Sequence, residues 1–275
     1  GGTLFLKEGS PFPLAAGGIA SIMAKTKLRA DQLLYDQGHV ESRERGKRLI
    51  MAGRAYCLDG DRRIPIDKPG RQFAEDVELG LTEPERFVSR GGYKLLTAIE
   101  AFGVDFTGKV VLDAGASTGG FTDCALQHGA ARVYAVDVGR AQLHERMLAD
   151  GRVVSMEGVN LRHAPEELLP EKVDVVVSDV SFISLTKILP SCVRFLKPGG
   201  EVVALIKPQF EVGPHQTDKG VVRDEGARLA AVADVVRFCG EELSLALVGS
   251  VPSRIKGPKG NQEYLAYFRL EAPAF

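Results

Sequence analysis

The chain has 275 residues, 44% of them hydrophobic and 26% charged, a composition typical of a globular protein with one large or two unequal domains. Its formal net charge of -1 excludes a strongly basic molecule, so a nucleic-acid surface would have to be local. The four cysteines form no C-x-x-C pair, which predicts reduced thiols and no metal site.

The first residues of the chain are set apart from the rest. The chain opens on Gly1-Gly2, whereas Met23 resembles a native start. We therefore expect residues 1–22 to be a leader or a disordered extension. A signal peptide is the alternative, although Lys7 and Glu8 interrupt the apolar stretch. No apolar run reaches the ~18 residues of a membrane-spanning helix, so we expect a cytoplasmic protein with no membrane partner.

The next segment predicts a small α+β domain. Apolar residues first recur at roughly helical spacing, which predicts two short helices. Gly38 fits the end of the first helix and Ser42 the N-cap of the second. Short runs interrupted by Gly and Pro then predict small strands as far as Leu81. We expect this domain to span residues 23–82 and a linker to occupy residues 83–90.

From residue 109 onward, apolar runs alternate with helical stretches. Continuous Val, Ile, Leu and Ala runs are typical of parallel strands with both faces covered. The last two strand-like segments, residues 245–252 and 263–270, are joined by a loop too short for a crossover helix, so the final strand should return antiparallel. For residues 91–271 we predict an α/β fold class, a Rossmann-like sheet with helices on both faces.

A glycine-rich turn follows the first of these strands. The sequence VVLDAGASTGGFT runs from Val110 to Thr122. Glycines in such a turn let a ligand approach the backbone closely. The spacing departs from G-x-G-x-x-G, and Asp113 at the strand end would repel a pyrophosphate but suits the ammonium group of S-adenosylmethionine. A nicotinamide dinucleotide is the alternative ligand.

Further along, two residues extend this predicted cofactor site. The second strand ends at Asp137, where a carboxylate can bind both hydroxyls of a ribose. Asn160, after the third strand, is the candidate for the adenine edge. The predicted contacts with S-adenosylmethionine are Asp113, Gly115, Ala116, Ser117, Gly119, Gly120, Asp137 and Asn160.

Four charged residues are placed in order around the glycine-rich turn. Asp179 and Lys207 follow two further strands, Glu263 opens the last strand, and Lys94 lies upstream of the first. A lysine that closes an apolar strand is costly to bury unless it is paired or functional. Each charge taken alone is typical of a solvated rim, whereas the four together indicate a catalytic site.

The order of these four residues resembles the K-D-K-E tetrad of the FtsJ-like ribose 2′-O-methyltransferases. The segments SRGGYKL, DAGASTGGFTD, SDVSFISL, LIKPQFE and GNQEYL resemble the signature of the TlyA family, also labelled hemolysin A, and the resemblance covers residues 23–270. The N-terminal stretch resembles an S4 RNA-binding domain, with residues 29–34 and 42–53 in its two helices.

The resemblance implies S-adenosylmethionine-dependent methylation of a ribose 2′-hydroxyl in ribosomal RNA, with cytidines of the small and large subunits as family targets. Lys207 would be the general base, and Asp179 and Glu263 would orient the lysines and the hydroxyl. The expected partner is ribosomal RNA or a ribosomal subunit, with no obligate protein partner and no metal.

Local basic residues would then contact the RNA. On one helix face, Arg43, Lys47 and Arg54 are expected to bind phosphates, and the loop from Ser253 to Gly260 carries three positive charges and no acid. Phosphate contacts of this kind position a nucleic acid without reading its bases. The predicted RNA-binding residues are Arg29, Arg43, Lys47, Arg54, Arg254, Lys256 and Lys259.

Three other functions remain open from the sequence. A nicotinamide-dependent oxidoreductase leaves the four charged residues without a shared role. A membrane-active hemolysin would need a membrane-spanning run that the sequence lacks. An RNA-binding protein with an inactive methyltransferase fold is disfavoured because all four tetrad positions are filled.

Overall fold

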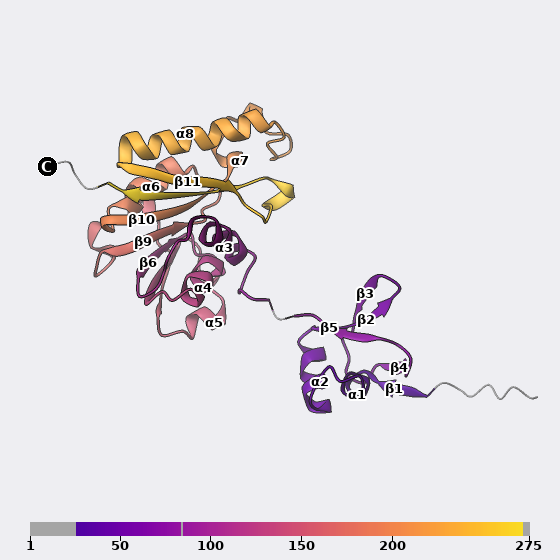
Figure 1. The fold of residues 1–275 in the computed structure, drawn as a ribbon. Helices are drawn as coiled ribbons and strands as arrows, with labels where there is room; N and C mark the ends of the chain where they lie inside the picture. Colours follow the sequence, from indigo (N-terminus) through magenta and orange to yellow (C-terminus); the bar gives the residue numbers. More distant parts are fainter. Residues whose placement is uncertain (1–25, 84, 272–275) are drawn as a thin grey trace, which may run out of the picture. The chain divides into compact units, whose positions relative to one another are not determined.

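The computed structural model describes residues 26–83 and 85–271, so the expectation for residues 1–22 lies outside the described residues. The chain divides into two compact units between residues 84 and 85 (Figure 1). The N-terminal unit mixes short helices and strands, and the C-terminal unit is built on one large sheet.

The N-terminal unit packs two helices with two small antiparallel sheets. Its elements are β1 (Lys27–Arg29), α1 (Ala30–Asp36), α2 (Arg43–Met51), β2 (Ala55–Asp59), β3 (Arg62–Pro65), β4 (Gln72–Ala74) and β5 (Leu79–Leu81). β1 pairs with β4, and β2 lies between β3 and β5. The apolar side chains of both helices and of the strands form one buried cluster, as the helical spacing and the short apolar runs predict.

The helix ends of this unit follow their sequence signals. Gly38, just after α1, has φ of 76°, a left-handed conformation that glycine adopts without strain. Ser42 caps α2, and its hydroxyl accepts a hydrogen bond of 3.2 Å from the N–H of Arg45. Where the two helices meet, a Cβ on Gly46 would lie 3.0 Å from the carbonyl oxygen of Asp31, which favours glycine at this contact.

The C-terminal unit contains one seven-stranded sheet. Its strands are β6 (Val110–Ala114), β7 (Arg132–Asp137), β8 (Val153–Glu157), β9 (Val173–Ser178), β10 (Leu196–Ile206), β11 (Leu245–Pro252) and β12 (Tyr264–Leu270). Their order is β11-β12-β10-β9-β6-β7-β8, with parallel pairs from β10 to β8 and with β12 antiparallel to both of its neighbours. The predicted α/β class and the returning last strand are confirmed.

Helices cover both faces of this sheet (Figure 1). They are α3 (Gly91–Phe102), α4 (Gly120–Gln127), α5 (Glu145–Leu148), α6 (Leu185–Val193), α7 (Pro208–Glu211) and α8 (Glu225–Leu243). Apolar residues of α3, α4 and α5 pack on one face, and those of α6 and α8 pack on the other. Neighbouring strand residues point to opposite faces, so Val111 and Leu112 of β6 belong to different clusters.

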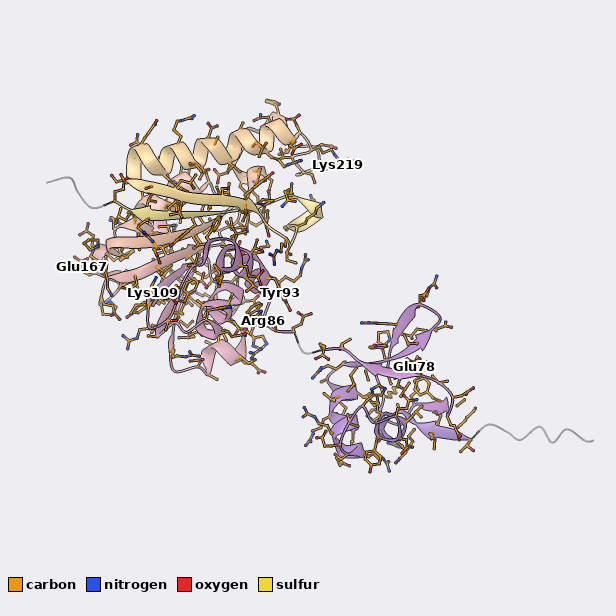
Figure 2. The ribbon with its side chains drawn as sticks, in the orientation of Figure 1. Glu78, Arg86, Tyr93, Lys109, Glu167 and Lys219 are labelled. Atoms are coloured by element: carbon orange, nitrogen blue, oxygen red, sulfur yellow. The ribbon has the colours of Figure 1, made fainter. Side chains whose placement is uncertain are left out.

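Residues 85–90 were expected in a linker, but they pack on the C-terminal unit. Phe87 is 1% exposed and contacts Tyr93 of α3 edge-on, with ring centroids 5.1 Å apart. Figure 2 labels Tyr93 and Arg86, the residue before Phe87. The N–H of Val88 donates to Asp123 Oδ2 in α4 at 2.8 Å. The second unit therefore begins before the expected residue, because a buried aromatic side chain anchors the segment that precedes α3.

All four cysteines are buried and free. Within residues 26–83 and 85–271, no three His, Cys, Asp or Glu side chains are grouped so that they could hold a metal ion. In the same ranges, every helix is too short or too polar to cross a membrane.

Candidate active site

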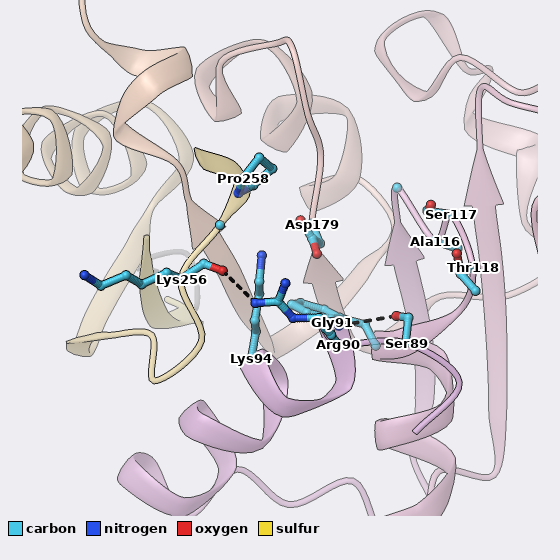
Figure 3. Close-up of a pocket in the computed structure, with 14 residues that line it drawn as sticks. Ser89, Arg90, Gly91, Lys94, Ala116, Ser117, Thr118, Asp179, Lys256 and Pro258 are labelled. Carbon is cyan, nitrogen blue, oxygen red and sulfur yellow. Dashed lines mark hydrogen bonds between the residues drawn. The ribbon is translucent and has the colours of Figure 1, made fainter. Parts of the chain in front are cut away.

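The loops after several parallel strands converge at the carboxyl edge of the sheet, where the sequence predicts a site. Two cavities lie there. The larger, of about 490 Å³, is lined by loops that follow β6, β7, β8 and β9. The smaller, of about 210 Å³, lies between the glycine-rich turn, the start of α3 and residues 256–258 (Figure 3). Gly115, Ser117 and Asp179 line both cavities, so the two meet at these residues.

The glycine-rich turn needs its glycines for steric reasons. Gly115 and Gly119 have φ values of 85° and 97°, a region that disfavours other residues. A Cβ on Gly115 would lie 2.9 Å from the carbonyl oxygen of Asp179, and one on Gly120 would lie 2.2 Å from Ser89 Oγ. The predicted cofactor residues of the turn that line a cavity are Gly115, Ala116, Ser117 and Gly120.

Two more of the predicted cofactor residues line the larger cavity. Asp137 accepts hydrogen bonds from the N–H of Ser117 at 2.8 Å and from the N–H of Gly139 at 2.7 Å. Asn160 accepts a hydrogen bond of 3.1 Å from the N–H of Arg162. These backbone contacts fix both side chains. Since a carboxylate offers about four acceptor positions, Asp137 keeps capacity for a ligand hydroxyl.

Asp113 lies behind the turn and not on a cavity wall. Its side chain is fully buried, Oδ2 accepts a hydrogen bond of 2.6 Å from the Thr122 hydroxyl, and Oδ1 has no hydrogen-bond partner among the described residues. Burial raises the pKa of Asp113 to about 7; the Thr122 hydrogen bond opposes this shift, and the charges of Asp179 and Asp137 add to it. A contact between Asp113 and a bound ligand would therefore have to pass through the turn or through a water molecule.

The four residues of the predicted tetrad come together as two ion pairs. Lys94 Nζ lies 2.6 Å from Glu263 Oε2, and Lys207 Nζ lies 2.7 Å from Asp179 Oδ1. The Glu263 side chain is 0% exposed and that of Lys207 is 8% exposed. Lys94 and Asp179 both line the smaller cavity (Figure 3). The four residues, far apart in the sequence, thus lie at one edge of the sheet, and each lysine is paired with a different carboxylate.

Lys207 lies directly after β10 and reaches the cavities only indirectly. Besides its ion pair, it donates a hydrogen bond of 2.7 Å to Ser181 Oγ. Lys207 itself does not line either cavity, whereas Asp179 lines both and Ser181 lines the larger. A ligand in the cavities would therefore contact Asp179 and Ser181, and Lys207 lies directly behind these two side chains.

Two residues to which the sequence interpretation gave no role also belong to this site. Phe182 is 90% exposed, has φ of 64° and packs against Phe210 with ring centroids 5.1 Å apart. A bulky residue with positive φ is strained, and such strain is concentrated at functional sites. Gln209 donates from Nε2 to Glu263 Oε1 at 3.0 Å. Both lie in the SDVSFISL and LIKPQFE segments, but exposure, strain and hydrogen-bond partner are not visible in the sequence.

The predicted basic loop borders the smaller cavity. Lys256 lines it, and its carbonyl oxygen accepts a hydrogen bond of 3.2 Å from Arg90 (Figure 3). Lys259 donates to the carbonyl oxygen of Lys219 at 2.9 Å, and Arg254 forms an ion pair with Glu100 of α3. Of the three predicted cations, Lys256 is therefore the one on the cavity wall.

The basic residues predicted to bind RNA in the N-terminal unit do not all lie on one helix face. Arg29 and Arg43 both contact the buried carboxylate of Asp31, at 2.9 Å and 3.3 Å. Lys47 is exposed on α2. Arg54 does not share the helix face with Arg43 and Lys47, because α2 ends at Met51 and Arg54 instead donates to the carbonyl oxygen of Thr82 at 2.7 Å.

Comparison with known proteins agrees with this geometry. The model of the FtsJ-like methyltransferase family matches residues 87–270. Over 248 residues the chain is 42% identical to the 16S/23S rRNA (cytidine-2′-O)-methyltransferase TlyA of Mycobacterium tuberculosis, covering 89% of this chain and 91% of that protein. A solved structure described as a hemolysin from Streptococcus thermophilus has a TM-score of 0.68 at 42% identity and covers 91% of both chains.

The same fold occurs in a more distant protein. A structure from Listeria monocytogenes described as an S-adenosylmethionine-dependent methyltransferase has a TM-score of 0.50 at 16% identity, covering 66% of this chain and 98% of that one. The family match and the 42% identical relative exclude the nicotinamide-dependent alternative, and S-adenosylmethionine is the methyl donor. The chain belongs to the FtsJ-like methyltransferase family and, within it, to the TlyA family.

Proposed function

We propose that the protein transfers the methyl group of S-adenosylmethionine to a ribose 2′-hydroxyl of ribosomal RNA, at cytidines of the small or large subunit. The observation that carries the proposal is a pair of ion pairs beside the two cavities: in Lys207–Asp179 the carboxylate lines both cavities, and in Lys94–Glu263 the lysine lines the smaller one. A relative of 42% identity is named for this reaction on 16S and 23S rRNA.

The larger cavity fits S-adenosylmethionine. Its volume of about 490 Å³ is in the range of small-molecule sites. Asp137 would hold the ribose hydroxyls and Asn160 the adenine edge, while the backbone from Gly115 to Ser117 would contact the methionine portion, with the buried Asp113 carboxyl behind it. S-adenosylmethionine supplies an electrophilic methyl carbon to this site.

Lys207 is the candidate general base. Asp179 and Ser181 both bind Nζ of Lys207, so the position of the amine is fixed. Asp179, the carboxylate of this ion pair, lines the cavities. In its neutral form Lys207 would take up the 2′-hydroxyl proton as the oxygen becomes nucleophilic. Lys94, held by Glu263, lines the smaller cavity, where its positive charge would stabilise negative charge on that oxygen.

The RNA would be held by basic side chains outside the tetrad. We assign the N-terminal unit as an S4-like RNA-binding domain, with Arg43 and Lys47 of α2 toward phosphates. In the catalytic unit, Lys256 at the smaller cavity would hold a phosphate next to the site. The exposed ring of Phe182, backed by Phe210, offers a surface on which an unstacked base can lie. The partner would be ribosomal RNA or a ribosomal subunit, in the cytoplasm.

Transfer of labelled methyl groups tests this proposal. Purified small subunits, large subunits and intact ribosomes are incubated with radiolabelled S-adenosylmethionine and either wild type, Lys207→Ala or the control Lys187→Ala, which removes an exposed lysine of α6. We expect label in RNA with wild type and the control, and a loss of at least about 100-fold with Lys207→Ala, the scale of general-base contributions. Full turnover by Lys207→Ala would refute the assigned base, while an absence of label with every protein would refute the proposed substrate.

A further inference from the structure

The single turn of α7 connects the two ion pairs of the site. Lys207, directly before α7, binds Asp179, and Gln209 within α7 binds Glu263. Glu211, at the end of the turn, accepts hydrogen bonds from Ser184 Oγ and from the N–H of Leu185, at the start of α6. The position of Gln209 is therefore fixed by a helix whose two ends are bound to neighbouring loops.

The buried carboxylate of Glu263 uses both of its oxygens. Oε2 is bound by Lys94 at 2.6 Å, and Oε1 is bound by the amide Nε2 of Gln209 at 3.0 Å. Glu263 is 0% exposed, and a Cβ on Gly257 would lie 2.1 Å from Oε1, so the carboxylate is enclosed on that side by backbone. Rotation of the carboxylate would change both contacts together, and Lys94 would move with it.

The amide of Gln209 can be oriented in only one way at this contact. Its carbonyl Oε1 is buried and has no hydrogen-bond partner among the described residues. The reverse orientation would place that oxygen against a carboxylate oxygen, which is repulsive because both are acceptors. The side chain of Gln209 therefore presents its donor, and not its acceptor, to Glu263.

From these contacts we infer that Gln209 is a positioning residue for methyl transfer: its amide holds Glu263 so that Lys94 points into the smaller cavity. This inference rests on the proposed function, because it assigns Lys94 a role in the transfer step. Gln209 does not itself line either cavity, so it acts through Glu263 and not on the substrate.

Two substitutions separate this role from simple packing. Gln209→Met keeps the length of the side chain and removes the donor. Gln209→Glu keeps the shape and places a second carboxylate against Glu263, so that the two share one proton at low pH and repel each other once it is lost. Gln216→Glu is the matched control, because Gln216 is exposed and its Oε1 accepts from the N–H of Gly213, as a carboxylate also can.

Turnover on ribosomal RNA is measured across pH for wild type and the three variants, with the dissociation constant of S-adenosylmethionine measured by calorimetry. We expect Gln209→Met to lower kcat on the order of tenfold, less than the roughly 100-fold loss that a misplacement of about 1 Å can cause, with cofactor affinity unchanged. For Gln209→Glu we expect kcat near that of wild type at the acidic end of the pH range. As pH rises and the shared proton is lost, kcat of Gln209→Glu should fall relative to kcat of wild type. Gln216→Glu should follow the wild-type profile.

Two results would overturn the inference. One is a kcat for Gln209→Met within twofold of wild type. The other is a pH profile of Gln209→Glu that runs parallel to wild type, because a residue that only fills space would respond to shape and not to the shared proton. Thermal unfolding tests the contact without substrate. Because the two carboxylates repel each other once the shared proton is lost, the melting temperature of Gln209→Glu, relative to wild type, should fall as pH rises. If wild type itself incorporates no label while this shift is present, the contact stands and the proposed reaction fails.

Discussion

Asp113 is a buried carboxyl group whose pKa burial raises from 3.8 to about 7. The folded protein therefore keeps a proton that the unfolded chain has lost, so this group contributes stability at low pH that disappears as pH rises toward 7. Above that pH the fold holds an ionised carboxylate in an apolar environment. We expect Asp113→Asn to change the melting temperature more favourably, relative to wild type, at pH 8 than at pH 5. Equal shifts at the two pH values would contradict this account of the group.

At single residues, the sequence predicts which charges form the site but not how they pair. Asp179 and Lys207 could be placed at one edge because both follow parallel strands, whose carboxyl ends share that edge. That Lys94 pairs with Glu263 could not be predicted, because the pair joins residues 169 positions apart through side-chain directions that only the packed fold defines. The same limit hides Ser181 and Gln209, whose roles consist entirely of their contacts.

At the scale of elements, the long apolar strands were predictable and the short segments between them were not. β11 has the predicted bounds of Leu245 to Pro252, because a run of strand-forming residues between clear breaks leaves little choice. The helix α3 and residues 85–90 were missed as packed elements, since Phe87 is buried by its contact with Tyr93 of α3 in an apolar cluster that only the folded chain assembles. Likewise α7 is only four residues long, and no periodicity marks a single turn.

The loop between β9 and α6 exposes the ring of Phe182, and we predict that this ring contributes to RNA binding. Because the ring is 90% exposed, Phe182→Ala removes little buried area, and we expect the melting temperature to stay near wild type. Loss of a base-stacking surface should raise KM for ribosomal RNA by about tenfold, from stacking energies of about 1–3 kcal/mol per base. Steady-state kinetics with ribosomal subunits measure this, and Phe182→Tyr should restore the wild-type value. An unchanged KM for Phe182→Ala would remove the ring from the RNA site.

For the whole molecule, the net charge of -1 means that RNA binding must depend on local cations. Each phosphate contact contributes roughly 1 to the slope of the logarithm of affinity against the logarithm of salt concentration. We therefore expect the double variant Arg43→Ala, Lys47→Ala to make that slope shallower by about 2 while cofactor binding is unchanged. Asp31 keeps its contact with Arg29 in this variant, so the N-terminal unit should remain folded.

The control for this experiment removes one lysine and one arginine from exposed positions of the catalytic unit, Lys187→Ala and Arg237→Ala. A slope that changes equally in both double variants would show that the two residues of α2 act only through total charge. A slope that stays at the wild-type value would place the RNA contacts elsewhere on the molecule.

Relatives in this family carry the name hemolysin, and one similar solved structure is described by that name. In the described residues no helix can span a membrane, and the paired charges at the sheet edge have a shared role in the proposed methyl transfer. Lysis by purified protein that persists in Lys207→Ala would show a membrane activity separate from this site.

The central claim is that the methyl group reaches a ribose 2′-oxygen of a cytidine, and the identity of the product nucleoside tests it most directly. Ribosomal subunits treated with wild type or Lys207→Ala are digested to nucleosides and analysed by mass spectrometry. We expect 2′-O-methylcytidine above background with wild type alone. A methyl group on a base, on another nucleoside or in equal amount with Lys207→Ala would contradict it.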